Sequence, residues 1–496
     1  MSVIVNEVRR ATYFDSMVLM RISRQIAGLP GVEEAGLFIG TPANKDILRE
    51  AGILGPDGDK AESGDLILAL RATDNVAGEA ALVEARRLLD QPRISGPSSS
   101  RVGSSRTIRA AVHAMPNANL ALISVPGHFA AAEARKALRC GLNVMIFSDN
   151  VPVEEEAALK RDARDLGLLV MGPDCGTSIV AGLPLGFANV VRRGEIGIIG
   201  ASGTGIQEVS CLIARGGGGI SHAIGTGGRD LEAQIGGITT LMAIDALDAD
   251  EETEHIVLIS KPPAASIVKL VVDRVAKSSK SFTICFLGAQ DFALPANARS
   301  ARTLKAAAEI GLGRSLSEDQ LKPPPMRSDR GKLVRGLFAG GTLCAEAQIV
   351  FRQAHLSVAS NEPVPGAAPL HGRKGGHVMM DLGHDEFTRG RPHPIIEPAM
   401  RESALTEAVR DPQIGVILLD IILGYGAHLD PAGHVAGVLA GSDGGPLVIA
   451  SVVGTDGDPQ PRADQVRTLS AAGVIVAASG ADAAEMAIRA IGTCDP

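Results

Sequence analysis

The chain has 496 residues, of which 45% are hydrophobic and 3% aromatic, and its formal net charge is −8. This length predicts about three domains, and the aliphatic, glycine-rich composition favours parallel α/β sheets, whose strands are buried on both faces. The negative charge and the shortage of aromatic side chains argue against binding to nucleic acid.

Six cysteines stand apart from one another without a CxxC pair, which predicts neither a disulfide framework nor a zinc site. We therefore expect a reducing compartment and no metal. The first residues lack an apolar core of the signal-peptide type, and no apolar run approaches the ~18 residues that span a bilayer. These features predict a cytoplasmic protein that does not bind membranes.

Short strands alternate with helices along most of the chain, which predicts five segments. Residues 1–92 form a small N-terminal α/β domain, and residues 93–108, rich in Gly, Ser and Pro, form a linker. Residues 109–190 form a Rossmann-like domain, and residues 191–320 a flavodoxin-like domain. A proline triplet marks a boundary before a second flavodoxin-like domain at 333–496. The predicted fold class is α/β with tandem doubly wound parallel sheets, in which the last two domains are an internal repeat.

Each of these two domains opens with a buried strand, a Gly–Thr turn and a helix, at Gly197–Glu208 and at Leu337–Glu346. Glycine lets the backbone approach a ligand closely, and the N–H groups at a helix start attract anions. The predicted phosphate- or carboxylate-binding residues are Ser202, Gly203, Thr204, Gly340, Gly341 and Thr342. The alternative is that both turns are ligand-free, as in many doubly wound folds.

Lys261 stands directly after a predicted strand that ends at Ser260. In parallel α/β sheets ligands bind at this carboxyl end, so we expect Lys261 to contact an anion. The glycine-rich segment with Gly227 and Gly228 is predicted to approach the ligand through its backbone, although tight turns alone would also require glycine.

The densest polar cluster spans residues 371–397. Arg389 and Arg391 are separated by a glycine and can fork onto a carboxylate or phosphoryl group. The histidines that can act there as acid, base or nucleophile are His377, His384 and His393. The alternative is an ordinary charged loop, and no spacing within the cluster requires a metal.

Residues 119–315 resemble the α subunit of succinyl-CoA synthetase. The motifs that carry this resemblance are Ser124–Pro126, Gly172–Cys175, Gly197–Thr204, Gly225–Gly228 and His255–Ile259. The C-terminal block, with Asp381–Gly383, looks like the ligase domain of that enzyme's β subunit. The whole chain is similar to the FdrA family through Gly40–Lys45, Ser260–Pro263 and His377–His393. The resemblance implies a fold like that of succinyl-CoA synthetase, a CoA-binding type of domain at 109–190, and Asp174 among the binding residues.

Two differences from succinyl-CoA synthetase bear on the chemistry. The loop expected to carry its phosphorylated histidine, Gly288–Ser300 here, contains no histidine. Lys261 replaces the expected glutamate, so a cation that attracts anions stands where a carboxylate would support a phosphohistidine. The resemblance to FdrA proteins, which are associated with allantoin degradation, then implies acyl-phosphate chemistry that depends on positioning and charge stabilisation.

The preferred hypothesis is an oxamate carbamoyltransferase subunit that transfers a carbamoyl group between carbamoyl phosphate and oxamate or oxalurate. The predicted catalytic residues are Lys261, His377, Arg391 and His393, with Arg389 at the second anion. The first alternative is an acyl-CoA synthetase that binds CoA, the one cofactor considered, and the second is a non-catalytic scaffold. The expected partners are small anionic substrates (carbamoyl phosphate, oxamate, or an acyl-CoA with phosphate) and further subunits in a hetero-complex or homo-oligomer.

Overall fold

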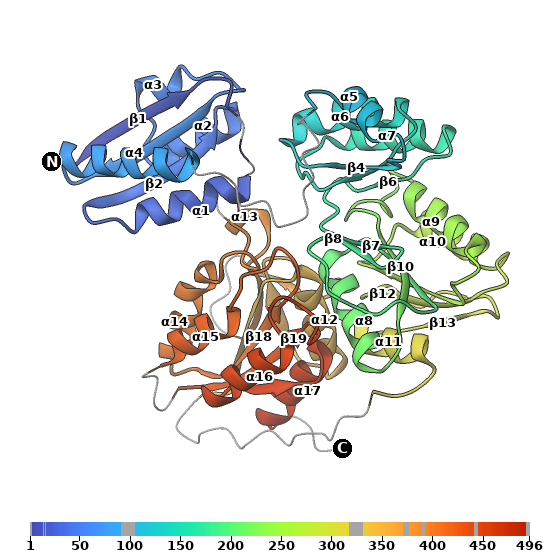
Figure 1. Ribbon diagram of the computed structural model, residues 1–496. Coiled ribbons are helices and arrows are strands. Elements are labelled where there is room, and N and C mark those ends of the chain that lie inside the picture. Colours follow the sequence, from blue (N-terminus) through green and yellow to red (C-terminus); the bar gives the residue numbers. More distant parts are fainter. Residues whose placement is uncertain are drawn as a thin grey trace. The chain divides into compact units, whose positions relative to one another are not determined.

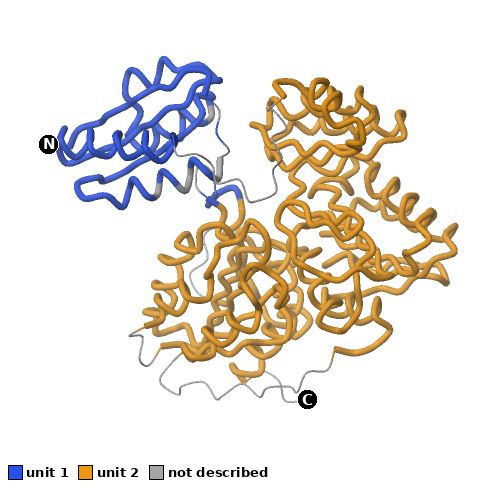
Figure 2. The backbone as a smooth tube through the Cα atoms, viewed as in Figure 1, with its two compact units in different colours: residues 1–103, 385–392 blue, residues 104–384, 393–496 orange. Residues whose placement is uncertain are grey.

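The computed structural model describes residues 2–12, 14, 16–90, 105–316, 331–370, 376–388, 392–440 and 445–492. The chain divides into two compact units, one of residues 1–103 with 385–392 and one of residues 104–384 with 393–496 (Figure 2). Most of the predicted linker at 93–108 and the proline triplet lie outside the described residues. Within the described parts, no helix is both long and apolar enough to cross a bilayer.

The N-terminal unit is an antiparallel three-stranded sheet in the order β1-β3-β2 with helices on both faces (Figure 1). Its elements are β1 (Val3–Arg9), α1 (Ser16–Ala27), β2 (Val32–Ile39), α2 (Pro42–Glu50), α3 (Pro56–Asp59), β3 (Leu66–Ala72) and α4 (Asn75–Asp90). The central strand β3 is apolar on both sides. Leu66, Leu68 and Leu70 pack against α1 and α4, whereas Ile67 and Ala69 pack on the side of α2. The four-residue helix α13 (Asp385–Thr388) also belongs to this unit.

The larger unit begins with a small parallel sheet in the order β4-β5-β6. Its elements are α5 (Ile108–Ala114), β4 (Leu120–Ile123), α6 (Gly127–Arg139), β5 (Asn143–Ile146), α7 (Val153–Asp165) and β6 (Val170–Met171). Alanines of α6, such as Ala130 and Ala134, pack closely against β5. The predicted domain at 109–190 therefore contains this sheet, but the next two strands pair elsewhere.

The first large sheet has seven strands in the order β13-β12-β11-β9-β10-β7-β8. Its elements are β7 (Thr177–Val180), β8 (Leu183–Gly186), β9 (Ile196–Gly200), α8 (Gly203–Arg215), β10 (Ile220–Gly225), α9 (Ile238–Ala249), β11 (His255–Ser260), α10 (Ala265–Val275), β12 (Ser281–Phe286), β13 (Ala298–Ser300) and α11 (Leu304–Leu312). The strands from β9 to β13 are parallel, and the hairpin of β7 and β8 adds an antiparallel edge next to β10.

The second large sheet also has seven strands, all parallel, in the order β16-β15-β17-β14-β18-β19-β20. Its elements are β14 (Leu333–Phe338), α12 (Gly341–Gln353), β15 (Val358–Ser360), β16 (Ala368–Pro369), β17 (His377–Asp381), the 3₁₀ helix η1 (Pro398–Arg401), α14 (Glu402–Arg410), β18 (Ile414–Ile422), α15 (Pro431–Leu439), β19 (Leu447–Val453), α16 (Arg462–Ala471), β20 (Ile475–Ala477) and α17 (Gly480–Ala490). Strand β17 lies within the polar cluster at 371–397, for which the alternative was an ordinary charged loop. Its three central residues, Val378–Met380, are apolar and pair with neighbouring strands.

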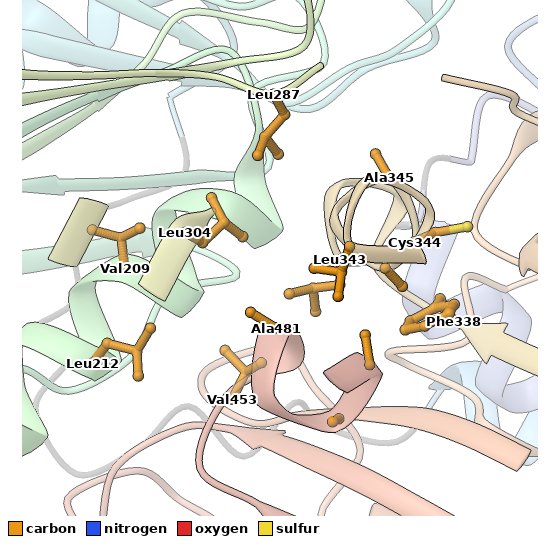
Figure 3. Close-up of a cluster of buried hydrophobic side chains, with 14 of the residues drawn as sticks. Val209, Leu212, Leu287, Leu304, Phe338, Leu343, Cys344, Ala345, Val453 and Ala481 are labelled. Atoms are coloured by element: carbon orange, nitrogen blue, oxygen red, sulfur yellow. The ribbon is translucent and has the colours of Figure 1, made fainter. Parts of the chain in front are cut away.

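Helices α8 and α11 of the first large domain pack against α12 and α17 of the second. Their apolar side chains form one continuous core, of which Figure 3 shows Val209, Leu304, Leu343 and Ala481. The two doubly wound domains of the predicted repeat therefore share a helix layer between their sheets. This packing fixes how the first residues of α8 and α12 face each other.

Candidate functional site

The two Gly–Thr turns meet in the structure. Ser202 is the N-cap of α8, and its hydroxyl shares a hydrogen bond with the Thr342 hydroxyl in the first turn of α12. A Cβ atom on Gly340 would lie 3.1 Å from the Thr204 side chain, so the two helix starts are in van der Waals contact. The sequence predicted two anion sites, and the structure brings their residues together in one place.

Only some of the amides at these helix starts are used by the protein itself. Ser202 accepts a hydrogen bond from the Gly205 amide at 3.0 Å. The carboxylate of Asp420, which is fully buried, accepts hydrogen bonds from the backbone amides of Ala339 and Gly340, each at 2.7 Å. The backbone amides without a partner among the described residues include those of Gly203, Thr204, Gly341 and Thr342. Since each helix start carries a partial positive charge, this junction is suited to hold an anion.

Lys261 leaves the carboxyl end of β11 and reaches the second domain. Its Nζ atom lies 3.6 Å from Oε2 of Glu362, which follows β15, and the two side chains are 53% and 37% exposed. At this exposure the pair contributes little to stability, so the ammonium remains available to a ligand. Glu362 also binds His384, whose Nε2 lies 3.0 Å from its Oε1. The carboxylate thus joins a cation and an imidazole beside the helix starts.

Asp381 ends β17 and touches the first residue of α12. A Cβ atom on Gly341 would lie 2.5 Å from Oδ2 of Asp381. Burial raises the pKa of Asp381 to about 6, although the nearby charge of Lys261 and the amide of Gly383 act in the opposite direction. This carboxyl group therefore changes protonation near neutral pH, which is the range where an acid or base catalyst works best.

Gly227 and Gly228 follow β10 along the same sheet edge as the Ser202 turn. The Thr226 amide donates to the Gly200 carbonyl at 2.9 Å, which places the two segments side by side. Gly227 has a φ of +84° and a Cβ atom there would lie 2.4 Å from the carbonyl of Pro173, so only glycine fits. Asp174 is exposed beside this segment, and its Oδ2 lies 4.0 Å from a Cβ built on Gly228.

A buried ion network holds this glycine segment. Lys160 of α7 is fully buried, and its Nζ lies 2.8 Å from Asp230, 2.9 Å from Glu156 and 3.0 Å from the carbonyl of Thr226. Asp230 also accepts hydrogen bonds from the first turn of α9, where both Thr240 groups, amide and hydroxyl, donate to it. The small sheet domain is thereby tied to the loop that carries Gly227.

Three of the predicted residues, His377, Arg389 and Arg391, lie apart from the helix junction or outside the described residues. His377 begins β17, so it lies a strand length, about 13 Å, from Asp381 at the other end. Its Nδ1 accepts the Val334 amide, and its ring packs edge-on against Phe351. The structure therefore does not bring His377 to Lys261. Arg389 and Arg391 lie outside the described residues.

His393 does lie near the site, next to Gly383 in the loop after β17. Its Nε2 is 2.6 Å from a Cβ built on Gly383, and its Nδ1 accepts the Ile395 amide at 3.2 Å. Burial, with a smaller contribution from the charge of Arg401, lowers the pKa of His393 to about 4. The imidazole is therefore neutral at physiological pH.

Cys175 and Cys344 are both buried free cysteines. Burial raises the pKa of Cys175 to about 11 and raises that of Cys344 as well, so both thiols are inert at neutral pH. Among the described residues, no group of three or more His, Cys, Asp or Glu side chains is arranged to hold a metal ion. Sequence reasoning gave no catalytic or binding role to Glu362 or Asp381. It named His384 as a possible acid, base or nucleophile but left it out of the predicted catalytic residues.

Three family models match separate parts of the chain. They are the CoA-ligase model at residues 337–490, the CoA binding domain at 191–288, and the AllF heavy metal-associated domain at 1–105. The uncharacterized protein YahF of Escherichia coli K12 is 43% identical over 494 residues, with 95% of both chains covered. This chain belongs to the YahF family. Its CoA-binding match falls on the first large domain and not on residues 109–190, where the sequence predicted a domain of that type.

Other relatives match over shorter stretches. The mitochondrial succinate–CoA ligase α-2 subunit of Trichomonas vaginalis is 31% identical over 150 residues, which cover 29% of this chain and 47% of that subunit. The chain thus spans about half of this ligase subunit. An acetyl-coenzyme A synthetase of Ca. Korarchaeum cryptofilum aligns over 76% of this chain and 84% of its own, at 16% identity and a TM-score of 0.32. The predicted fold class and the resemblance to succinyl-CoA synthetase are confirmed at the level of CoA-ligase domains.

The segment matched by the heavy metal-associated model lacks two common types of metal ligand. Residues 1–105 contain neither cysteine nor histidine, and these are the ligands that soft transition metals prefer. Among the sequence relatives named above, the one with an assigned activity is a succinate–CoA ligase subunit and not a carbamoyltransferase.

Proposed function

We propose that this protein is an enzyme of the acid–thiol ligase class that binds an acyl phosphate where the first turns of α8 and α12 meet. The observation that carries the proposal is the convergence of two helix starts, with unpaired amides at Gly203, Thr204, Gly341 and Thr342. Lys261 lies close enough for its charge to lower the pKa of Asp381, the carboxyl group that lies against Gly341. Two partial positive charges and one ammonium favour a phosphate dianion at this point. The CoA-ligase relatives support the same chemistry.

Each group at the proposed site has a separate role in the reaction. The helix amides and the hydroxyls of Ser202 and Thr342 orient the phosphoryl oxygens, and Lys261 neutralises their charge. When a thiol attacks the acyl carbon, the C–S bond forms, the C–O bond to phosphate breaks, and the phosphate leaves with the electron pair. The helix starts stabilise that leaving charge, and His384, held by Glu362, accepts the thiol proton. CoA is the thiol that this proposal favours, because the matched family models are a CoA-ligase and a CoA binding domain.

Carbamoyl transfer is the second candidate function. Carbamoyl phosphate is an acyl phosphate that arrives already activated, so its transfer needs no phosphorylated enzyme. The absence of histidine from Gly288–Ser300 favours this candidate, because the histidine relay of the resembling synthetase has no residue there. If a phosphoenzyme does form, His384 is the histidine that the site offers, and intact-protein mass spectrometry would detect the added phosphoryl group in wild type and its loss in His384→Asn.

The first experiment measures binding of acetyl phosphate and carbamoyl phosphate to the full chain by titration calorimetry. Lys261→Met should weaken both by about tenfold or more, since a charge-assisted contact is lost. Lys269→Met is the matched control, because that lysine is 77% exposed and pairs with Asp273 on α10. Equal affinities in wild type and Lys261→Met would refute the site.

The second experiment separates the two candidates. Consumption of the CoA thiol in the presence of acetyl phosphate would support ligase chemistry, and phosphate release from carbamoyl phosphate that depends on oxamate would support carbamoyl transfer. Binding without either reaction would refute both activities for the isolated chain and leave a scaffold that retains the anion site.

A further inference from the structure

A cavity of about 400 Å³ lies at the other end of α8 from the helix junction. It opens between the last turn of α8, the residues that follow α11 and the start of α17. Helix α8 has 13 residues, so the cavity is about 20 Å from Ser202. It is therefore separate from the site proposed above, and its volume falls in the range of small-molecule sites.

Positive charge predominates on the cavity wall. Arg215, Lys305 and Arg314 line it, with Asp482 as the one carboxylate among its lining residues. Lys305 pairs with Asp482 at 2.7 Å, which leaves the two arginines in excess. The side chain of Arg314 is exposed and has no ion pair or hydrogen bond within the described part of the chain.

Arg215 contributes buried hydrogen-bond donors without partners to the cavity wall. Its Nη2 donates to the carbonyl of Ala478, but its buried Nε and Nη1 atoms have no hydrogen-bond partner among the described residues. A buried donor without a partner destabilises the folded state, and an anion in the cavity would accept these hydrogen bonds. At the start of α17 two amides are already used, because Gly480 donates to Glu208 and Asp482 donates to Ser479.

Apolar side chains complete the cavity. Leu212 and Leu316 line it, together with the backbone of Gly216 and Gly217. Gly217 has a φ of +76°, and a Cβ atom there would lie 2.8 Å from Nη2 of Arg314, so glycine at this position leaves room for the guanidinium. Guanidinium groups beside an apolar wall match a molecule that joins a phosphate to an organic part.

We propose that this cavity is a second ligand site, which binds a small phosphorylated organic anion through Arg215 and Arg314. The site is independent of the activity proposed above and stands or falls by its own residues.

Titration calorimetry of the full chain with pyrophosphate and with ADP tests the proposal. Lys261→Met serves as the background, since it weakens anion binding at the helix junction. In that background both probes should still bind, ADP more tightly because its nucleoside reaches Leu212 and Leu316. Adding Arg314→Gln should weaken both by about tenfold or more, since one charge-assisted contact is lost.

Arg467→Gln is the matched control, because Arg467 is 73% exposed on α16 and remote from the cavity lining. Its affinities should equal those of the background. Thermal melting should show that Arg314→Gln is folded, since that side chain is exposed. Absence of binding in the Lys261→Met background, or equal binding with and without Arg314→Gln, would overturn the second site whatever the fate of the first.

Discussion

Glu346 places a carboxyl group in the buried helix layer between the two large sheets. It lies in α12 at the position that Glu208 occupies in α8, six residues after the N-cap in each helix. One of its oxygens accepts the Leu304 amide at 2.6 Å, while the buried Oε2 has no hydrogen-bond partner among the described residues. Burial, reinforced by repulsion from Glu208, raises the pKa of Glu346 from 4.5 to about 8.

This shift sets the sign of a pH effect on stability. Between pH 4.5 and 8 the folded state keeps the proton on Glu346 and the unfolded state releases it, so folding becomes less favourable as the pH rises. The free energy of unfolding should fall by about 1.4 kcal/mol per pH unit, or by roughly 4 kcal/mol between pH 5 and 8. Glu346→Gln cannot ionise and should lose this slope.

Differential scanning calorimetry can measure the difference. For a unit of about 385 residues, a change of about 1 kcal/mol in the free energy of unfolding shifts the Tm by about 1 °C. The Tm of Glu346→Gln minus that of wild type should therefore rise by about 3–5 °C from pH 5 to 8 and stay constant above. The glutamine amide can itself change the Tm by an amount that does not depend on pH. Comparing how the two Tm values vary with pH removes that constant difference.

The control for this measurement is Glu485→Gln on α17. That carboxylate is 52% exposed and pairs with Arg489, so the substitution should leave the pH profile parallel to wild type. A difference between Glu346→Gln and wild type that does not change with pH would refute the assignment of a protonated carboxyl to this layer.

Two further substitutions test how the site is held. Lys160→Met should destabilise the larger unit by about 3–5 kcal/mol, since it leaves the buried carboxylate of Asp230 unpaired, and an unchanged Tm would contradict this. Gly341→Ala should lower the Tm and weaken acetyl phosphate binding, because the added methyl group would press on Asp381 at 2.5 Å. Gly437→Ala is its control in α15, where a Cβ meets nothing within 4 Å, and should stabilise by about 1 kcal/mol. Similar behaviour of the two alanine variants would refute the close contact.

Local patterns predicted many elements closely. The strand predicted to end at Ser260, directly before Lys261, ends at that residue in β11. Strand β17 was missed, because three apolar residues among histidines, glycines and carboxylates leave too short a pattern. The same strand decides which histidines reach the site, since it carries His377 to one end and places His384 beyond the other.

By itself the sequence determined the α/β class, the two Gly–Thr helix starts and the place of Lys261 after a strand, because backbone preferences and burial periodicity are local properties. Only the tertiary structure decided that the two helix starts touch, that Glu362 joins Lys261 to His384, and that the carboxyl of Asp381 lies against Gly341. These contacts join residues about 20 to 140 positions apart in the chain. They depend on strand order and on the packing of one helix layer between two sheets, which no short stretch of residues encodes.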